Sequence, residues 1–329
     1  MSKISVIGAG TWGVALALVL KDNGHDVTVW CYLENEERGL SNDRKHPNLP
    51  GAVIPDDVVF TCDLAKAMEN DLLVLAVPST ATRATANNMK PYFAENKLII
   101  SVAKGIEENS LMTQTQIISD VLGEDIRLVA LSGPSHAEEV SLKYPTLVVA
   151  GSDNKHDAVI AQNLFMNEYF RVYTSPDMIG MEVGAALKNV IALAAGISDG
   201  IGFGDNGKAA LITRGMKEIS SLAMAMGGHI ETLWGLAGIG DLMVTGFSKH
   251  SRNRQCGYLL GQGMKYEEAI KNVGMVVEGV YSVKAAIALA KKYNVSMPIT
   301  EVINDVLFND LDCAAAVKML MTRDRKSEY

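Results

Sequence analysis

The amino-acid sequence predicts an α/β fold, in which an N-terminal domain with a doubly wound parallel sheet precedes a C-terminal all-helical domain. Short, continuous apolar runs recur through the first half of the chain, as expected for parallel strands that are covered on both faces. After Pro176 the strand signal almost disappears and long helical patterns follow. We therefore place the domain boundary near 176–182, which divides the chain into residues 1–178 and 179–329.

The first domain begins with a predicted strand, helix and strand. Residues 4–7 and 27–30 are short apolar runs, and residues 11–21 between them are rich in Ala and Leu. A strand–helix–strand unit of about 30 residues is the building block of a doubly wound sheet. Further strands are predicted at 72–77, 98–102 and 127–131, and two edge strands at 146–150 and 170–173.

The second domain is predicted from helical patterns alone. Helix formers dominate this part of the chain, and turn residues separate one helical segment from the next. The predicted helices cover residues 181–195, 209–226, 266–272, 280–293 and 299–307. A chain of 329 residues is long enough for about two domains, which agrees with this division.

The composition is that of an ordinary soluble globular protein, with 48% apolar and 21% charged residues. The net charge of -8 disfavours nonspecific nucleic-acid binding, because that binding depends on neutralising phosphates. An anionic small molecule would therefore need a local basic site rather than a general positive field.

The four cysteines include no CxxC pair and the six histidines no HxxxH spacing, so we expect no metal site. Isolated cysteines are typical of a reducing compartment. The N-terminal apolar run contains a glycine-rich turn instead of a cleavage site, and no apolar stretch approaches the roughly 20 residues that span a bilayer. These features predict a cytoplasmic protein without a membrane span.

A glycine motif follows the first predicted strand and opens the first predicted helix. It reads Gly8-Ala9-Gly10-Thr11-Trp12-Gly13 and has the GxGxxG spacing of a Rossmann-like dinucleotide site. In such a site the first glycine permits a tight turn, the second lets the backbone approach the pyrophosphate, and the third allows close packing of helix and strand. The alternative is a purely structural glycine turn.

The choice between NAD and NADP is not evident from the sequence. The selecting residue is expected at the end of the second strand, where an acidic residue favours NAD and an arginine favours NADP. This chain has Tyr32 there, followed by Glu34 and, further on, Arg38. The pattern leans slightly towards NAD, although Glu34 is equally well explained as a solvated loop residue.

Two lysines are candidates for proton transfer to or from a substrate oxygen. Lys104 follows a predicted strand, at the end of the sheet where doubly wound folds bind ligands. Lys188 lies inside an apolar helix, and burial would lower its pKa towards a catalytically useful value. Each lysine, taken alone, is more often an ordinary surface residue.

Two downstream motifs suggest partners for these lysines and for an anion. Asp241 follows two glycines, so that its carboxylate could pair with a buried Lys188 or simply cap a helix. Ser251, Arg252 and Asn253 offer a hydroxyl, a guanidinium and an amide that suit a phosphate group. A solvated basic turn explains the same three residues.

Taken together, the motifs resemble those of the soluble, bacterial-type NAD(P)-dependent glycerol-3-phosphate dehydrogenases. The matches occur in order along almost the whole chain, which makes the set much more specific than any single motif. Besides the glycine turn they are Asn48-Leu49-Pro50-Gly51, Val77-Pro78-Ser79, Lys104-Gly105-Ile106-Glu107, Ser132-Gly133-Pro134-Ser135-His136-Ala137, Leu187-Lys188-Asn189, Gly240-Asp241, Ser251-Arg252-Asn253 and Val277-Glu278-Gly279. The chain departs from the common pattern at Tyr32, where a basic residue or histidine is frequent.

The resemblance implies reversible hydride transfer between NAD(P)H and dihydroxyacetone phosphate, giving sn-glycerol 3-phosphate for glycerophospholipid synthesis, in a homodimer. It makes Lys188 the catalytic proton donor or acceptor. The implied substrate-binding residues are Lys104, Gly133, Ser135, Lys188, Asp241, Ser251, Arg252 and Asn253. The implied cofactor-binding residues are Gly8, Gly10, Thr11, Trp12, Gly13, Tyr32, Lys104, Ala137, Arg252, Val276 and Glu278. For Val276 and Glu278 the resemblance is the only argument.

Two other functions remain open at this point. The β-hydroxyacid dehydrogenases and ketopantoate reductases also join a dinucleotide domain to a helical domain, and Arg252 could bind their carboxylate substrates instead. A noncatalytic dinucleotide sensor would keep the glycine motif but would not need a paired Lys188 and Asp241.

Overall fold

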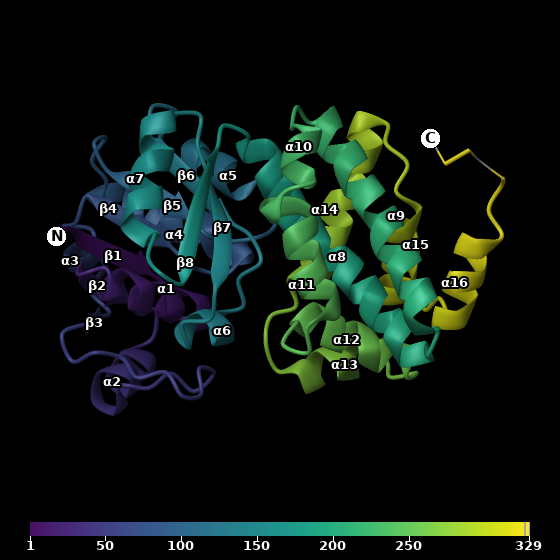
Figure 1. Ribbon diagram of the computed structural model, residues 1–329, viewed down its shortest axis with the longest axis horizontal. Coiled ribbons are helices and arrows are strands. Elements are labelled where there is room, and N and C mark those ends of the chain that lie inside the picture. Colours follow the sequence, from purple (N-terminus) through teal and green to yellow (C-terminus); the bar gives the residue numbers. More distant parts are fainter. Residues whose placement is uncertain (326, 329) are drawn as a thin grey trace.

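The computed structural model describes residues 1–325 and 327–328. A sheet domain and a helical domain lie side by side, with the N-terminus in the first (Figure 1). The chain opens with β1 (Lys3–Ile7), α1 (Thr11–Asp22) and β2 (Asp26–Trp30), and β1 pairs with β2 in parallel. The predicted strand–helix–strand unit is therefore confirmed.

The sheet has the strand order β3-β2-β1-β4-β5-β6-β7-β8 within the described residues. The remaining strands are β3 (Val59–Thr61), β4 (Leu72–Leu75), β5 (Leu98–Ser101), β6 (Arg127–Ser132), β7 (Thr146–Gly151) and β8 (Phe170–Ser175). The order of the first six strands, 3-2-1-4-5-6, is that of the dinucleotide-binding doubly wound fold.

Two details of the sheet differ from the sequence-based prediction. The strand at 146–150 was expected at an edge, but β7 lies between β6 and β8, and it runs antiparallel to β6. The other edge is β3, which was not predicted because three residues are too few to show a period. Only β8 occupies an edge as expected.

Helices cover both faces of the sheet, as the apolar strands require. Alternate residues of β1 point to opposite faces: Ile4 and Val6 pack in a cluster with α1, and Ile7 packs in another cluster with Met89 and Ile118. The helical segments of this domain are α2 (Glu34–Asp43), α3 (Leu64–Ala67), η1 (Ser79–Ala81), α4 (Thr82–Met89), η2 (Lys90–Tyr92), α5 (Gln114–Leu122), α6 (Ala137–Ser141) and α7 (Lys155–Phe165).

The C-terminal part is helical, as predicted. The five expected helices correspond to α8 (Met178–Ile201), α9 (Gly204–Ala225), α13 (Tyr266–Val273), α14 (Glu278–Tyr293) and α15 (Pro298–Phe308). The structure adds segments that the sequence pattern does not predict: α10 (Ile230–Leu233), the π-helical turn η3 (Leu236–Gly240), α11 (Asp241–Phe247), α12 (Arg252–Gly261) and α16 (Cys313–Met321).

The long helix α8 is the centre of the helical domain (Figure 1). Its 24 residues are long and apolar enough to cross a membrane, so the expectation that no apolar stretch reaches that length is wrong. However, 89% of its most apolar window is buried inside the protein. The apolar character of α8 is thus explained by its position in the core.

Helix α12 packs very closely on α8, and this contact positions the N-terminus of α12. A Cβ atom on Gly196 of α8 would lie 2.0 Å from the carbonyl oxygen of Arg254, and one on Gly257 would lie 2.0 Å from that of Leu193. Only glycine permits such an approach of the two backbones. As a result, Arg252 begins α12 close to the helix that carries Lys188.

Candidate active site

The glycine turn between β1 and α1 has a different geometry at each glycine. Gly8 has a φ angle of +118°, and a Cβ atom there would lie 2.6 Å from the carbonyl oxygen of Ala76. A Cβ atom on Gly13 would lie 2.1 Å from the carbonyl oxygen of Gly8. By contrast, a Cβ atom on Gly10 would meet nothing within 4 Å. Gly8 and Gly13 are thus required by the fold, whereas Gly10 borders space that a ligand can use.

The first turn of α1 offers hydrogen-bond donors to such a ligand. The helix begins at Thr11 with no acidic residue in its first turn, so its N-terminal N–H groups and positive dipole end are not neutralised there. The indole Nε1 of Trp12 is buried and has no hydrogen-bond partner in the described part of the chain. An indole N–H can only donate, so it requires an acceptor. These residues fit a dinucleotide pyrophosphate.

The candidate selector residues after β2, Tyr32, Glu34 and Arg38, are all exposed. Tyr32 is 75% exposed and its ring lies edge-on to that of Trp30, with 6.1 Å between the ring centroids. Glu34 is the first residue of α2, and Arg38 lies one turn later. Glu34 is thus solvated, but it lies in the first turn of α2 and not in a loop.

Lys188 and Asp241 form the centre of a polar cluster between the two domains. Both are buried. The Lys188 ammonium, on α8, donates to Oδ1 of Asp241 and to Oγ1 of Thr245 at 2.8 Å. Lys104 donates to Oδ2 of Asp241 at 2.7 Å and to the carbonyl oxygen of Gly133 at 3.1 Å. Asp241 thus bonds a lysine from each domain instead of capping a helix.

The charges in this cluster shift the pKa values of its members. Burial, followed by the positive charge of Lys104, lowers the pKa of Lys188 to about 7, although the charge of Asp241 acts in the opposite direction. Burial alone would raise the pKa of Asp241, but the charges of Lys104 and Lys188 hold it below its ordinary value. Lys188 is thus placed to exchange a proton near neutral pH.

The segment after β6 lies beside this cluster. Gly133 has a φ angle of +149°, and the hydroxyl of Ser135 donates to its carbonyl oxygen at 3.0 Å. Ala137 begins α6 and is buried. The ring of His136 packs against that of His250, with centroids 5.9 Å apart. Burial is the main cause that lowers the pKa of His136, and the positive charge of Lys188 lowers it as well. The predicted residues Gly133 and Ser135 therefore lie near Lys104.

The three residues at the start of α12 are used in different ways. Ser251 is the N-cap, and its Oγ accepts from the backbone N–H of Arg254 at 3.2 Å. The amide side chain of Asn253 is buried and uses both of its polar atoms. Its NH2 group donates to Oδ1 of Asn189 at 3.0 Å, and its oxygen accepts from the backbone N–H of Gly279 at 2.8 Å. Arg252 is exposed and pairs with no carboxylate in residues 1–325 and 327–328. Apart from the N–H of Arg254, which Ser251 caps, Arg252 and the first backbone N–H groups of α12 are therefore open to an anion.

The last two predicted cofactor residues lie at the start of α14. Val276 is 37% exposed, two residues before the helix. Glu278 is the first residue of α14 and accepts two hydrogen bonds from Ser79 of the sheet domain. Burial raises its pKa, and the bonds from Ser79 and the charge of Arg252 oppose this shift. Glu278 therefore lies at the domain interface, with Arg252 near enough to influence it.

Two contacts of this site were not identified from the sequence. Thr245 holds Lys188 and lies one turn after Asp241 on α11, so a prediction of that short helix would have placed both on one face. Ser79 occurs in a motif of the family pattern, but nothing in the sequence pairs it with Glu278.

The cavity of about 670 Å3 between β8 and α10, lined by residues that include Tyr173, contains none of the predicted site residues.

The doubly wound sheet, the glycine turn and the buried lysine between two domains define the class of protein. This class is the two-domain, nicotinamide-dinucleotide-dependent dehydrogenases. Family models sharpen this assignment: the N-terminal domain model of NAD-dependent glycerol-3-phosphate dehydrogenase matches residues 3–158, and the C-terminal model matches residues 177–318.

Curated relatives agree with these matches. A protein of Agathobacter rectalis named glycerol-3-phosphate dehydrogenase (NAD(P)+) is 57% identical, covering 100% of this chain and 98% of its own. One of the same name from Fusobacterium nucleatum is 55% identical, covering 100% of this chain and 99% of its own. The crystal structure of glycerol-3-phosphate dehydrogenase from Coxiella burnetii has a TM-score of 0.94 at 37% identity, covering 98% of this chain and 99% of that one. The chain belongs to the NAD-dependent glycerol-3-phosphate dehydrogenase family.

A more distant structural neighbour shows how far the fold extends. A ketopantoate reductase from Ralstonia eutropha has a TM-score of 0.62 at 17% identity and covers 96% of this chain. At this identity the likeness concerns the fold alone. The two-domain architecture that was expected to be common to this chain and the ketopantoate reductases is thus observed. The relatives of high identity over the full chain assign the family.

Proposed function

We propose that this protein catalyses the reversible transfer of a hydride between NAD(P)H and dihydroxyacetone phosphate, which gives sn-glycerol 3-phosphate. The observation that carries the proposal is the buried ammonium of Lys188, bonded by Asp241 at the interface of a dinucleotide fold and a helical domain. Family membership and the names of relatives at 55–57% identity support this substrate pair.

The cofactor site is formed by the residues around the glycine turn. Gly8, Gly10 and Gly13 shape the turn, and Thr11 and Trp12 open α1, where the N–H groups face the pyrophosphate. The further cofactor residues that we propose are Tyr32, Lys104, Ala137, Arg252, Val276 and Glu278. The bound reduced nicotinamide supplies the hydride.

Lys188 performs the proton transfer. In the reducing direction its ammonium donates a proton to the ketone oxygen as that oxygen gains charge, and in the oxidising direction its amine removes the alcohol proton. Asp241 and Thr245 hold the Lys188 nitrogen, and Lys104 adds positive charge beside it. An oxygen that develops negative charge is stabilised by such cations where water is excluded.

The phosphate of the substrate binds at the start of α12. Arg252 has no ion pair to break within the described residues and can form two parallel bonds to phosphate oxygens. Ser251, Asn253, Gly133 and Ser135 complete the substrate site that we propose. Because the phosphate does not react, its binding fixes the orientation of the ketone at Lys188.

The first experiment is oxidation of NADH and of NADPH in the presence of dihydroxyacetone phosphate or unphosphorylated dihydroxyacetone. We expect rapid turnover only with the phosphorylated ketone, and the ratio of the two rates gives the cofactor preference. Lack of turnover with both cofactors would reject the proposal and direct attention to small keto and hydroxy acids.

We further propose a cytoplasmic homodimer that supplies glycerophospholipid synthesis. Sedimentation of the purified protein tests the dimer, and fractionation of the cell tests the location.

We also propose that residues 1–178 form the nucleotide-binding domain and residues 179–329 the substrate-binding and catalytic domain. The end of β8 at Ser175 and the start of α8 at Met178 support this division. Separate expression of the first segment, followed by nucleotide binding, tests it.

A further inference from the structure

Three motifs of the family pattern meet at one point between the domains. Ser79 begins η1 after β4, Gly105 follows β5, and Glu278 begins α14 of the helical domain. The backbone N–H of Ser79 donates to Oε1 of Glu278 at 3.3 Å, and its hydroxyl donates to Oε2. These residues are 199 positions apart. One serine therefore binds both oxygens of a carboxylate from the other domain.

Gly105 leaves the space in which this contact forms. A Cβ atom on Gly105 would lie 2.5 Å from both Cβ and Oγ of Ser79, and 3.7 Å from Oε2 of Glu278. Any larger residue at 105 would displace the Ser79 hydroxyl. The glycine of this motif is thus explained by the contact between Ser79 and Glu278.

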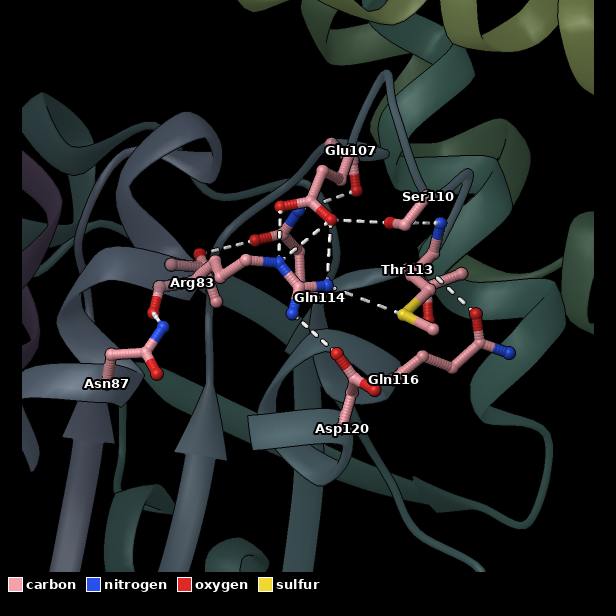
Figure 2. A network of polar contacts seen from close by, with 11 residues as sticks. Arg83, Asn87, Glu107, Ser110, Thr113, Gln114, Gln116 and Asp120 are labelled. Carbon is pink, nitrogen blue, oxygen red and sulfur yellow. Dashed lines mark hydrogen bonds and ion pairs between the residues drawn. The ribbon is translucent and has the colours of Figure 1, made fainter. Parts of the chain in front are cut away.

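The two loops that carry Ser79 and Gly105 are fixed to each other. Arg83, in the helix that follows Ser79, donates to both carboxylate oxygens of Glu107, at 2.9 Å from Nε and 2.8 Å from Nη2 (Figure 2). Gln114 lies beside this ion pair in Figure 2, and its amide donates to the carbonyl oxygen of Gly105 at 2.9 Å. These bonds hold together the two loops that carry Ser79 and Gly105 on the sheet domain.

Glu278 is equally well fixed on the helical domain. The next residue, Gly279, donates its N–H to Asn253 at 2.8 Å, and Asn253 donates to Asn189 at 3.0 Å. Asn253 and Asn189 directly follow Arg252 and Lys188 in the chain. Hydrogen bonds on either side of the Glu278–Gly279 peptide bond thus connect Ser79 to the two helices that carry the proposed phosphate and proton-transfer residues.

We propose that Ser79 is a positioning residue for binding of the nicotinamide nucleotide. Ser79 holds the carboxylate of Glu278 beyond the carboxyl end of β4, where this carboxylate binds the nucleotide. This inference rests on the proposed function, because that end of the sheet is where a doubly wound fold binds its nucleotide. A carboxylate can only accept hydrogen bonds, and each oxygen keeps a lone pair after bonding Ser79. The nicotinamide nucleoside offers matching donors, its carboxamide NH2 and its ribose hydroxyls.

The test is a double-mutant cycle on nucleotide affinity, measured without substrate. Ser79→Ala in the full-length protein should raise the Kd for NADH about tenfold, as expected when a charge-assisted hydrogen-bond network is lost. In the background of Glu278→Ala the same substitution should have almost no effect, because Ser79 acts through Glu278. Gly105→Ala should reproduce the effect of Ser79→Ala. Thr80→Ala, at the exposed next residue of the same turn, should leave the Kd unchanged.

The outcomes separate this inference from the proposed function. An unchanged Kd in Ser79→Ala, or an equal effect with and without Glu278, would overturn the inference even if the wild type reduces dihydroxyacetone phosphate. A wild type that binds NADH but does not reduce that ketone would reject the proposed substrate and leave the cycle interpretable. If Ser79→Ala does not fold, Ser79→Cys replaces it in the cycle, because the thiol is similar in size to the hydroxyl but is a weak hydrogen-bond donor. The bonds of Glu182 to Thr113 and Thr115 still join the domains in each variant.

Discussion

Lys188 donates to Oδ1 of Asp241, a residue 53 positions later in the chain. The other oxygen of the same carboxylate accepts from Lys104 at 2.7 Å, so that two lysines share one aspartate. With both lysines protonated the cluster carries a net positive charge, which favours loss of a proton from the more buried Lys188. The same excess of positive charge attracts an anionic substrate in a protein whose net charge is -8.

Replacement of Lys188 by methionine should lower kcat for ketone reduction by at least about a hundredfold, because the proton donor is lost while the volume of the side chain is kept. The affinity for NADH should not change. Steady-state kinetics and a direct binding titration measure the two effects. Lys291→Met, on the exposed face of α14, is the matched control and should behave as the wild type. Full turnover in Lys188→Met would remove this residue from the mechanism.

The rate of ketone reduction should fall as the pH rises through about 7, because the pKa of Lys188 is lowered to about 7 and only its ammonium form donates a proton. The reverse reaction should become faster over the same range. Asp241→Asn removes the charge that raises this pKa, so its pH profile for reduction should move to lower pH. The pH dependence of kcat/KM in both directions measures this, and identical profiles for wild type and variant would contradict it.

Arg252→Ala should raise the KM for dihydroxyacetone phosphate about tenfold to a hundredfold, since a charged hydrogen bond to phosphate is lost. Its thermal stability should be unchanged, because Arg252 is exposed and pairs with no carboxylate in the described chain. Arg254 is the contrasting residue: it bonds Asp199 at 2.8 Å, so Arg254→Ala should lower Tm and affect KM much less. Kinetics and thermal melting distinguish the two variants, and the opposite pattern would exchange their roles.

Gly10→Ala and Gly13→Ala should fail in different ways. A methyl group at Gly13 collides with the carbonyl oxygen of Gly8, so this variant should lose about 1–3 kcal/mol of stability or more. A methyl group at Gly10 meets no protein atom within 4 Å, so that variant should keep its Tm but bind NADH more weakly. Melting curves and nucleotide titrations test the pair. Normal NADH binding by Gly10→Ala would place the pyrophosphate elsewhere.

Tyr32→Arg should increase kcat/KM for NADPH relative to NADH, because an arginine at the end of β2 can bind the 2′-phosphate. The exposed position of Tyr32 leaves room for the longer side chain. Tyr32→Gln removes the ring without adding charge and is the control. The ratio of the two kcat/KM values is the measurement, and equal ratios in wild type and Tyr32→Arg would exclude this position as the selector.

The sequence by itself determined the local elements and the glycine turn. The strand–helix–strand unit and the long helices α8 and α14 follow from periodicity, and Gly8 and Gly13 follow from a turn that no other residue permits. These features depend on neighbours in the chain, so they can be read from it. Shorter elements such as β3 and α11 contain too few residues for a period and were not predicted.

Only the tertiary structure decided which polar groups meet. Asp241 could have capped a helix and Lys188 could have been exposed; packing of α11 against α8 buried both and paired them. Packing likewise engaged the amide of Asn253 with Asn189 and joined Ser79 to Glu278 across the domains. These partners lie 53 to 199 residues apart. Spacing in the chain carries no information about such contacts, because they are selected by the burial of apolar helix faces around them.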